Sequence, residues 1–223
     1  MGQSTAVVTD SLACITSGLA EQYNVIVVPL TFILLGKVYR DWVDIKPSQA
    51  YELFLQDPDS FQTSAPSPAV FLNAFREASQ RAANILCVTV SDKLSTTFNT
   101  AILAVKQAAV ELPGTKIEIY DTGTATAAEG LVVLAAAKAA AEGKNFEDVI
   151  KETKAVAGKV KLHVVLDTIR HVYRSGRIPK IASQIGSVLH VKPILSITPD
   201  SEGLVRFIGV VRSRQNGING FLR

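Results

Sequence analysis

Clusters of small hydroxyl and acidic residues follow apolar stretches at four places in the first 125 residues of this chain. They are Thr9-Asp10-Ser11, Thr63-Ser64 with Ser67, Ser91 to Thr97, and Asp121-Thr122 with Thr124. Serine and threonine hydroxyls donate hydrogen bonds, and the amides at a helix N-terminus add further donors and a favourable dipole. Such donors are typical of a site that holds a carboxylate or a phosphate. The sequence has no glycine-rich phosphate loop and no serine hydrolase elbow that would indicate a standard catalytic site.

Helix capping is the alternative role for these hydroxyls. A cap accounts for one hydroxyl per helix, but less readily for the several between Ser91 and Thr97. Asp10 could bind a metal, although an Asp-Ser pair ahead of an apolar helix favours a cap. The three histidines lie apart from any triad-like serine, and their spacing does not match a zinc site. Spacing alone therefore leaves phosphate binding, carboxylate binding and capping open.

Charge is unevenly distributed along the chain, whose net charge is +3. Residues 1–158 carry 12 Lys and Arg against 17 Asp and Glu, whereas residues 159–223 carry 11 against 3. This asymmetry predicts a basic surface for an acidic ligand or partner, with a solvated face as the alternative. Arg170, Arg174 and Arg177 are spaced as one basic face, and Arg177 stands in a predicted loop where it can bind an acid. Aromatic or helical patterns of nucleic-acid recognition are absent, so we expect no nucleic-acid partner.

Strands that alternate with helices must position these side chains. Strands are predicted at 5–9, 85–90 and 116–120, with a strongly apolar segment at 25–35. Helices are predicted after Ser11, from Pro47, from Pro68, from about Ser95, over 125–141, and after a capping Asn145. In an open parallel sheet the carboxyl ends of the strands meet along one crevice, where ligands bind. The pattern predicts a Rossmann-like α/β domain over residues 1–158, with helices on both faces of a parallel sheet.

A second, smaller α/β domain is predicted over residues 159–223. It has a strand at 161–166, a helix closed by Gly176, a helix near 180–189, and a hairpin of 191–197 and 204–211. Residues 215–223 carry no strong pattern. A domain of roughly 65 residues is near the lower limit for an independent core, so we expect this domain to be partial.

The composition favours a soluble globular protein. The apolar share of 48% is ample for a buried core, and no apolar run reaches membrane-spanning length. The N-terminus does not have the pattern of a secretory signal. Cys14 and Cys87 lie far apart in apolar settings and are predicted to be buried free thiols. These features predict a cytoplasmic protein without a bound metal or cofactor.

Seven segments extend the hydroxyl clusters into a longer pattern. They are VVTDSLA, VVPLTFILLGKVYRD, TSAPSP, VSDKLSTTFNTA, YDTGTATAAEG, YRSGRIPK and VKPIL. Together and in this order they resemble the DegV family over nearly the whole chain. The resemblance implies a lipid-binding protein that holds a long-chain fatty acid between two α/β domains. It implies no chemistry of its own, because the family presents the fatty acid to the catalytic subunit of a fatty acid kinase, similar to dihydroxyacetone kinase.

The resemblance also implies roles for individual residues. In TSAPS it implies that Thr63 binds the fatty acid carboxylate, and in LSTT that Ser95 lies beside Thr63. In SGRI it implies that Arg177 lies near the head group, for phosphate transfer or partner docking. The neighbouring hydroxyls are candidates for supporting contacts: Ser64, Ser91, Thr96 and Thr97. Asp10-Ser11 and Asp121-Thr122 are then scaffolding. Transient contact with a membrane is compatible with this role.

Two features depart from the family pattern. Thr96 stands where the family usually has glycine, which affects the backbone of its loop. Family members also continue beyond this chain's last residue to finish the second domain, so we expect that domain to be truncated here. The alternative function is a metal- or phosphate-dependent enzyme that acts on a small acidic substrate in the same crevice, with Asp10, Asp121 and the Ser91–Thr97 loop as its reactive groups.

Overall fold

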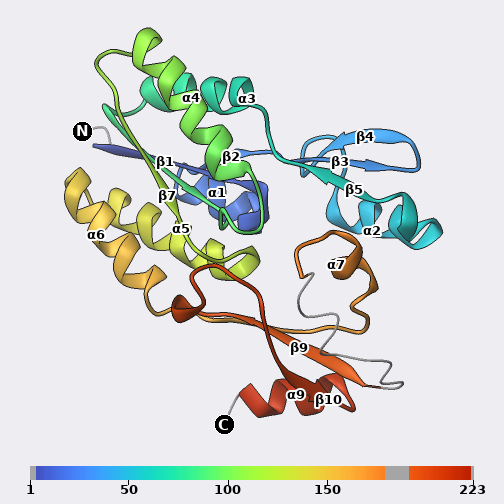
Figure 1. Ribbon diagram of the computed structural model, residues 1–223. Coiled ribbons are helices and arrows are strands. Elements are labelled where there is room, and N and C mark those ends of the chain that lie inside the picture. Colours follow the sequence, from blue (N-terminus) through green and yellow to red (C-terminus); the bar gives the residue numbers. More distant parts are fainter. Residues whose placement is uncertain (1–3, 179–190, 222–223) are drawn as a thin grey trace.

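A four-stranded parallel sheet forms the centre of the computed structural model, which describes residues 4–178 and 191–221 (Figure 1). Its strand order is β2-β1-β6-β7, and all three pairings are parallel. The bounds of the strands are Thr5–Asp10 for β1, Ile26–Val28 for β2, Asn84–Thr89 for β6 and Lys116–Asp121 for β7. Strands β1 and β6 occupy the middle of the sheet, and their apolar side chains are buried.

Helices cover both faces of this sheet, because successive side chains of a strand point to opposite faces. On one face, Val8 and Ile85 pack with α3 (Pro68–Ser79) and α4 (Thr97–Glu111). On the other face, Val7 and Leu86 pack with α5 (Thr126–Ala141) and α6 (Phe146–Ala157). The α/β class and the double covering of the parallel sheet that the sequence predicts are confirmed. None of the helices within the described residues is long and apolar enough to cross a membrane.

The apolar segment 25–35 is divided between two sheets. Its first part is β2, and its second part is β3 (Thr31–Leu34), which pairs antiparallel with β4 (Lys37–Arg40) and β5 (Gln62–Ser64). Pro29 lies between the two parts and has no N–H for a strand ladder. Between β4 and β5 the chain forms α2 (Pro47–Gln56) and the 3-10 turn η2 (Pro58–Ser60). Figure 1 shows this small sheet to the right of the parallel sheet.

A second antiparallel sheet follows α6. Its order is β10-β9-β8, with bounds Leu162–Val165 for β8, Lys192–Ile197 for β9 and Arg206–Val211 for β10. The predicted hairpin is confirmed as β9 and β10, joined through the 3-10 turn η3 (Pro199–Ser201). Helices α7 (Arg170–Arg174) and α9 (Arg214–Phe221) complete this smaller α/β unit. The predicted helix near 180–189 lies outside the described residues, and the domain boundary after residue 158 stays a prediction.

Two local predictions near the N-terminus are wrong. The helix expected directly after Ser11 is only the 3-10 turn η1 (Ser11–Ala13), and α1 (Ser17–Gln22) begins after a Thr16 cap. Cys87 is buried as predicted, but Cys14 is exposed. Cys14 ends η1 in a left-handed backbone conformation with a φ of 52°. Ala13 and Ile15 on either side are buried in the core, so the turn directs only the Cys14 side chain outward.

Candidate ligand-binding site

The loop Ser91–Thr97 connects the carboxyl end of β6 to the start of α4. Ser91 N–H donates to the Thr124 carbonyl oxygen at 2.8 Å, which ties the loop to the neighbouring β7–α5 connection. The Ser91 hydroxyl accepts a hydrogen bond from Lys93 N–H at 3.2 Å and donates to the Gly203 carbonyl oxygen at 3.3 Å. Ser91 is buried, so its hydroxyl holds the η3 loop of the smaller unit against the parallel sheet. This contact is structural.

Ser95 lies near the α4 end of the same loop and is half-buried. Its Oγ is 2.8 Å from Thr97 Oγ1 and accepts a hydrogen bond from Thr97 N–H at 3.3 Å. When the buried Thr97 hydroxyl donates to Ser95, the Ser95 proton remains available for an acidic ligand. Thr96 is exposed at the N-cap position, and its side chain makes no capping hydrogen bond. The loop thus orients one hydroxyl, on Ser95, at the N-terminus of a fifteen-residue helix.

Arg177 reaches this loop from the smaller unit. Its Nε donates to the Leu94 carbonyl oxygen at 3.2 Å, and its Nη1 donates to the Ser175 carbonyl oxygen at 2.7 Å. The side chain is exposed, and the next residue, Ile178, is buried in the smaller unit's core. The structure therefore brings Arg177 beside the Ser95 loop, although 82 positions separate the two residues in the sequence.

Thr63 and Ser64 lie on β5, at the edge of the small antiparallel sheet. Thr63 is exposed and pairs with Phe32 of β3, so it shares the face of the sheet that carries Phe32. The Ser64 hydroxyl donates to the Ala65 carbonyl oxygen at 3.3 Å. Among the described residues no hydrogen bond joins Thr63 to Ser95 or Arg177. The assignment of Thr63, Ser95 and Arg177 to one ligand site stays a prediction.

A buried pair of carboxyl groups lies behind the strand ends, and one member was not predicted as a site residue. Asp10 accepts hydrogen bonds from Leu12 N–H and Val90 N–H, both at 3.0 Å. Burial raises the pKa of Asp10 to about 6, against the lowering effect of these two donors. Glu129 of α5 is fully buried beside Asp10, and a protonated Glu129 can donate a hydrogen bond to the Asp10 carboxylate. Burial and the Asp10 charge raise the pKa of Glu129 well above its ordinary value.

Asp10, Asp121 and Thr122, which are predicted to be scaffolding, bind backbone groups of neighbouring loops. Both carboxyl oxygens of Asp10 bind backbone donors, and those of Asp121 accept from Gly123 N–H at 2.8 Å and Asp92 N–H at 3.2 Å. The Thr122 hydroxyl donates to the Thr89 carbonyl oxygen at 2.9 Å. Each of these side chains therefore ties one strand-end loop to another, as expected of scaffolding. In the described part of the chain, no three His, Cys, Asp or Glu side chains are grouped as metal ligands.

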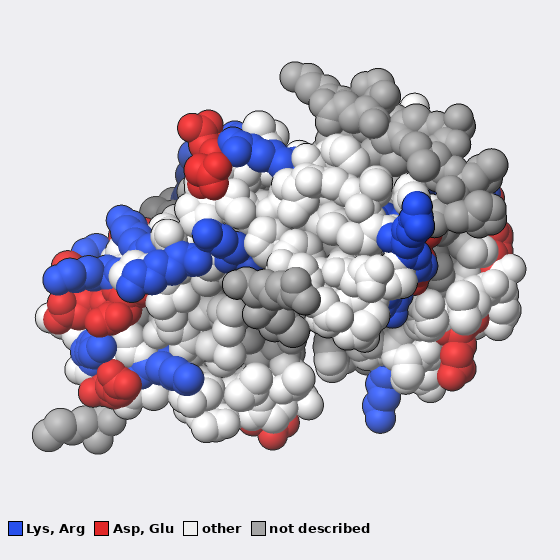
Figure 2. All heavy atoms as spheres, turned by 90° about the horizontal axis from the view of Figure 1, so that it is seen from below, with Lys and Arg blue, Asp and Glu red and all other residues white. Residues whose placement is uncertain are grey.

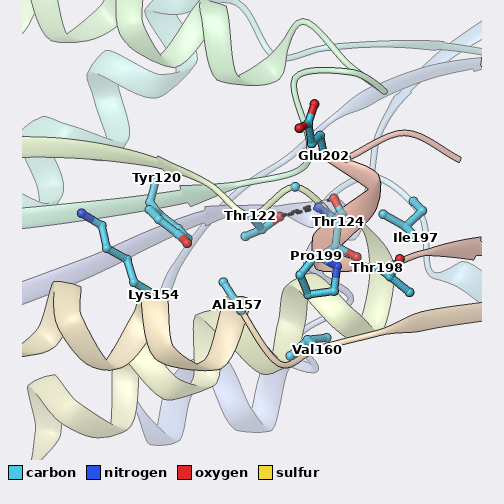
Figure 3. A pocket seen from close by; sticks show the side chains of 13 residues that line it. Tyr120, Thr122, Thr124, Lys154, Ala157, Val160, Ile197, Thr198, Pro199 and Glu202 are labelled. Carbon is cyan, nitrogen blue, oxygen red and sulfur yellow. Dashed lines mark hydrogen bonds between the residues drawn. The ribbon is translucent and has the colours of Figure 1, made fainter.

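A cavity of about 250 Å³ lies where the end of β7 meets α6 and η3. Figure 3 shows Tyr120 and Lys154 on one side of it and Thr198 and Pro199 on the other. Burial and the nearby Asp121 raise the pKa of the Tyr120 phenol. Thr122 and Thr124 of the fourth hydroxyl cluster line this cavity, whereas Thr63, Ser95 and Arg177 are not among its described lining residues. It lies at the junction of the two units, and Ser91 at the start of the Ser91–Thr97 loop is hydrogen-bonded to two of its lining residues, Thr124 and Gly203.

The predicted basic surface of residues 159–223 is largely engaged in ion pairs. Arg170 and Arg174 both bind Asp59 of η2, and Arg174 also donates to the Asp59 carbonyl oxygen at 2.7 Å. Lys192 and Arg214 both bind Asp167. Figure 2 shows Lys and Arg side chains at several separate places on this face of the molecule, with Asp and Glu side chains close to several of them and a broad uncharged area in the middle. The three arginines thus do not form one free basic face, because Asp59 binds two of them.

A family model described as an uncharacterised protein of the DegV family, COG1307, matches residues 4–221. The chain belongs to the DegV family. A DegV domain-containing protein of Caldanaerobacter subterraneus is 32% identical over 216 residues, which is 97% of this chain and 74% of that protein. One of Clostridium perfringens is 34% identical over 214 residues, or 96% of this chain and 74% of the relative. The family resemblance inferred from the seven segments is confirmed.

Solved structures of other proteins share this fold. A DegV family protein from Thermus thermophilus, described with fatty acid binding, has a TM-score of 0.85 at 31% identity and covers 100% of this chain and 76% of its own. A stearic acid-binding protein from Eubacterium ventriosum has a TM-score of 0.88 at 25% identity, with coverage of 100% and 74%. Both likenesses cover the whole of this chain.

Proposed function

We propose that this chain binds a long-chain fatty acid between the parallel-sheet unit and the smaller unit. The likeness to the Thermus thermophilus protein, over the full length of the chain and at 31% identity, carries this proposal. The position of Arg177 against the Leu94 carbonyl oxygen supports it, because an arginine from one unit then stands beside the hydroxyl loop of the other. A carboxylate that lies there would have donors from both units.

The acyl chain would contribute most of the affinity, and the polar residues would set its position. Burial of each methylene contributes roughly 0.8 kcal/mol, so a long chain gains on the order of 10 kcal/mol. A hydrogen bond to a charged group contributes only about 1.5–3 kcal/mol. In this proposal Thr63 and Ser95 donate to the carboxylate, and Arg177 lies near its outer side. The head group would then be held at the edge of the protein, where a partner can reach it.

The proposal assigns phosphate transfer to a second protein. A kinase subunit that uses ATP would phosphorylate the presented carboxylate, and this chain would act as its lipid-binding subunit in the cytoplasm. The arrangement around Ser95 supports a binding role, because its hydroxyls bind one another and backbone groups rather than a general base. Mixing the chain with ATP and a catalytic subunit of the dihydroxyacetone kinase type should yield an acyl phosphate only when both proteins are present.

Mass spectrometry of the purified protein under native conditions tests lipid binding. The mass should exceed that of the polypeptide by one fatty acid, and organic extraction should release that acid. Delipidated protein should take up added oleate or palmitate from solution. Recovery of no lipid together with no uptake of either acid would contradict the proposed function.

Alanine in place of Thr63 or Ser95 should weaken fatty acid binding without unfolding the protein. Loss of one hydrogen bond to a carboxylate corresponds to a fall in affinity of about tenfold to a hundredfold. Displacement of a fluorescent fatty acid measures this fall, and thermal unfolding checks the fold. Ser17→Ala is the matched control, because Ser17 is an exposed serine at the start of α1. If both site variants bind as tightly as that control, Thr63 and Ser95 do not hold the carboxylate.

Arg177→Ala should lower the rate of acyl phosphate formation more than the affinity for the fatty acid. The guanidinium makes two contacts to backbone carbonyl oxygens and has five N–H donors in total, so further donors can meet a head group or a phosphate. Two quantities are measured for the variant and the wild type: the rate of product formation with the kinase subunit present, and the affinity for the fatty acid with that subunit absent. Arg212→Ala removes an exposed charge from the same unit and serves as the control. An equal loss of both quantities in Arg177→Ala contradicts the assigned role.

A further inference from the structure

The hydroxyl group of Thr97 is buried at the start of α4 and has a single hydrogen-bonding neighbour in the described part of the chain. Thr97 is the first residue of the helix and is fully buried. Its Oγ1 lies 2.8 Å from Ser95 Oγ. A buried hydroxyl proton without an acceptor is costly, and the large majority of buried polar atoms are paired in folded proteins. The Thr97 proton therefore belongs in the bond to Ser95.

This requirement sets the direction of the hydrogen bond between the two hydroxyls. If Ser95 donated to Thr97, the Thr97 proton would be buried without an acceptor among the described residues. If Thr97 donates, the Ser95 proton is the free one, and it can reach water or a ligand because Ser95 is half-buried. Only this second arrangement satisfies both hydroxyls. Thr97 is thus the donor and Ser95 the acceptor.

Ser95 accepts a second hydrogen bond from the same residue. Thr97 N–H, the first amide of α4, donates to Ser95 Oγ at 3.3 Å. A serine hydroxyl has two lone pairs and one proton, so Thr97 occupies both lone pairs. Thr96, at the N-cap position, makes no capping hydrogen bond with its side chain. Ser95 therefore caps the helix through its lone pairs and keeps its proton for another group, so capping and ligand binding are compatible on one serine.

The neighbouring arginine also offers only donors. Arg177 Nε donates to the carbonyl oxygen of Leu94, the residue before Ser95. A guanidinium has five N–H donors and no acceptor. Ser95 and Arg177 thus both present protons and no free lone pair. The Thr63 hydroxyl can donate or accept, so it does not add to this selection.

A head group that carries protons of its own fits these two residues poorly. An amide has two N–H donors and an alcohol has one O–H donor, and neither Ser95 nor Arg177 can accept from them. A donor that loses its water and finds no acceptor lowers the affinity. An ionised carboxylate has only acceptors, and hydrogen bonds to a charged acceptor are the stronger kind.

We propose that Thr97 is a positioning residue that makes Ser95 a hydrogen-bond donor only, and that the site thereby prefers an ionised carboxylate to neutral head groups with N–H or O–H donors. Thr97 does not touch the ligand in this proposal, because its hydroxyl is buried and already bound to Ser95. It acts through Ser95 instead of making the supporting contact expected from the sequence. The inference rests on the proposed function, since it concerns the head group of the same fatty acid.

Palmitate and palmitamide test this selection, because they have the same acyl chain and differ in the head group. Alanine and serine at position 97 both lack the threonine methyl group, and only serine keeps the hydroxyl. Thr97→Ser should keep the wild-type ratio of palmitate affinity to palmitamide affinity. Thr97→Ala frees a lone pair of Ser95 for the amide, so this ratio should fall about tenfold, the value of one hydrogen bond to a charged group. Competition with a fluorescent fatty acid measures both affinities.

A purely structural role of the Thr97 hydroxyl would give a different result. If the hydroxyl only maintained the shape of the loop, its loss would weaken palmitate and palmitamide binding by the same factor, and the ratio would stay constant. Thr100→Ala and Thr100→Ser are the matched controls, because the Thr100 hydroxyl donates to the Thr97 carbonyl oxygen at 2.8 Å within the same helix. Both should leave the ratio unchanged. Thermal unfolding checks that the four variants are folded.

Ser95→Ala tests whether Thr97 acts through Ser95. Without the Ser95 hydroxyl the ratio should be low, and a further Thr97→Ala should not change it. Equal ratios in Thr97→Ala and Thr97→Ser overturn the proposal, as does a further fall of the ratio in the double variant. In either case palmitate binding by the wild type leaves the proposed function standing. A wild type that binds no palmitate contradicts the proposed function, and this inference with it.

Discussion

Glutamine in place of Glu129 is expected to stabilise the fold at neutral and mildly alkaline pH. Glu129 is fully buried, and its hydrogen-bonding neighbour is the Asp10 carboxyl group. Asp10 carries the negative charge of the pair, because Leu12 N–H and Val90 N–H both donate to it. Burial and this charge raise the pKa of Glu129 well above its ordinary value, so the folded protein keeps the Glu129 proton. Glutamine has a similar shape and no proton to lose.

The pH dependence follows from where the proton resides. The unfolded chain releases the Glu129 proton near the ordinary pKa of 4.5, while the folded chain retains it. Above that pH the unfolded state binds fewer protons, so the free energy of unfolding falls as the pH rises, up to the folded-state pKa. Asp10, with a pKa of about 6, adds a decline of the same sign between its ordinary value of 3.8 and about 6.

Urea unfolding of the wild type and Glu129→Gln over a range of pH measures this effect. The variant should be the more stable protein above about pH 6, and its stability should depend less on pH. Asp10→Asn, in contrast to Glu129→Gln, should destabilise the protein. Asparagine offers one oxygen to two buried N–H groups, which should cost about 1–3 kcal/mol. A pH dependence in Glu129→Gln as steep as that of the wild type would show that Glu129 is ionised in the fold.

Periodicity predicted the main layers because buried strands and amphipathic helices leave local signals. The parallel strands β1, β6 and β7 and the hairpin of β9 and β10 lie within a residue or two of their predicted ranges. The small antiparallel sheet was not predicted, because 25–35 is one apolar segment in the sequence and only its pairing divides it between sheets. Helix α9 was not predicted either. It contains Gly217 and Gly220, which weaken a helical pattern, and contacts with β8 and β10 hold it.

The sequence predicts a site residue only where its type and its position in the chain indicate a role. Ser95 stands at a strand end before a helix, which the sequence shows, and the structure adds its hydrogen bond with Thr97. Arg177 stood out as a loop arginine, but its contact with Leu94 depends on how the two units meet. Glu129 lies in an alanine-rich helix where a single acid usually marks the solvent side. Only the packing of α5 against η1 reveals that this acid is buried.

Alanine in place of Gly203 should weaken the contact between the two units and lower the free energy of unfolding. Gly203 has a φ of +79°, and an added Cβ would overlap the Ser91 hydroxyl. The backbone of Gly203 also lies against Gly123, so little space exists for a shift. The left-handed conformation costs alanine about 1–2 kcal/mol, and the overlap should add about 1–3 kcal/mol. Urea unfolding measures the total.

Gly143→Ala is the matched control for this substitution. Gly143 has a φ of +76°, and a Cβ there would meet nothing within 4 Å. The two variants share the cost of the left-handed conformation, so the difference between them measures the overlap with Ser91. If they are equally destabilised, the η3 loop moves freely and the contact between Ser91 and Gly203 does not hold the units together.

The double variant Ser91→Ala, Gly203→Ala tests whether the Ser91 hydroxyl is the group that the added Cβ overlaps. Ser91→Ala alone should destabilise the protein by about 1 kcal/mol, because it removes the hydrogen bonds to Gly203 and Lys93. In the double variant the atom that causes the overlap is absent, so the combined loss should be smaller than the sum of the single losses. If the ligand lies between the units, fatty acid affinity should fall most in the variants that lose the most stability. An affinity that Gly203→Ala leaves unchanged would place the ligand within one unit.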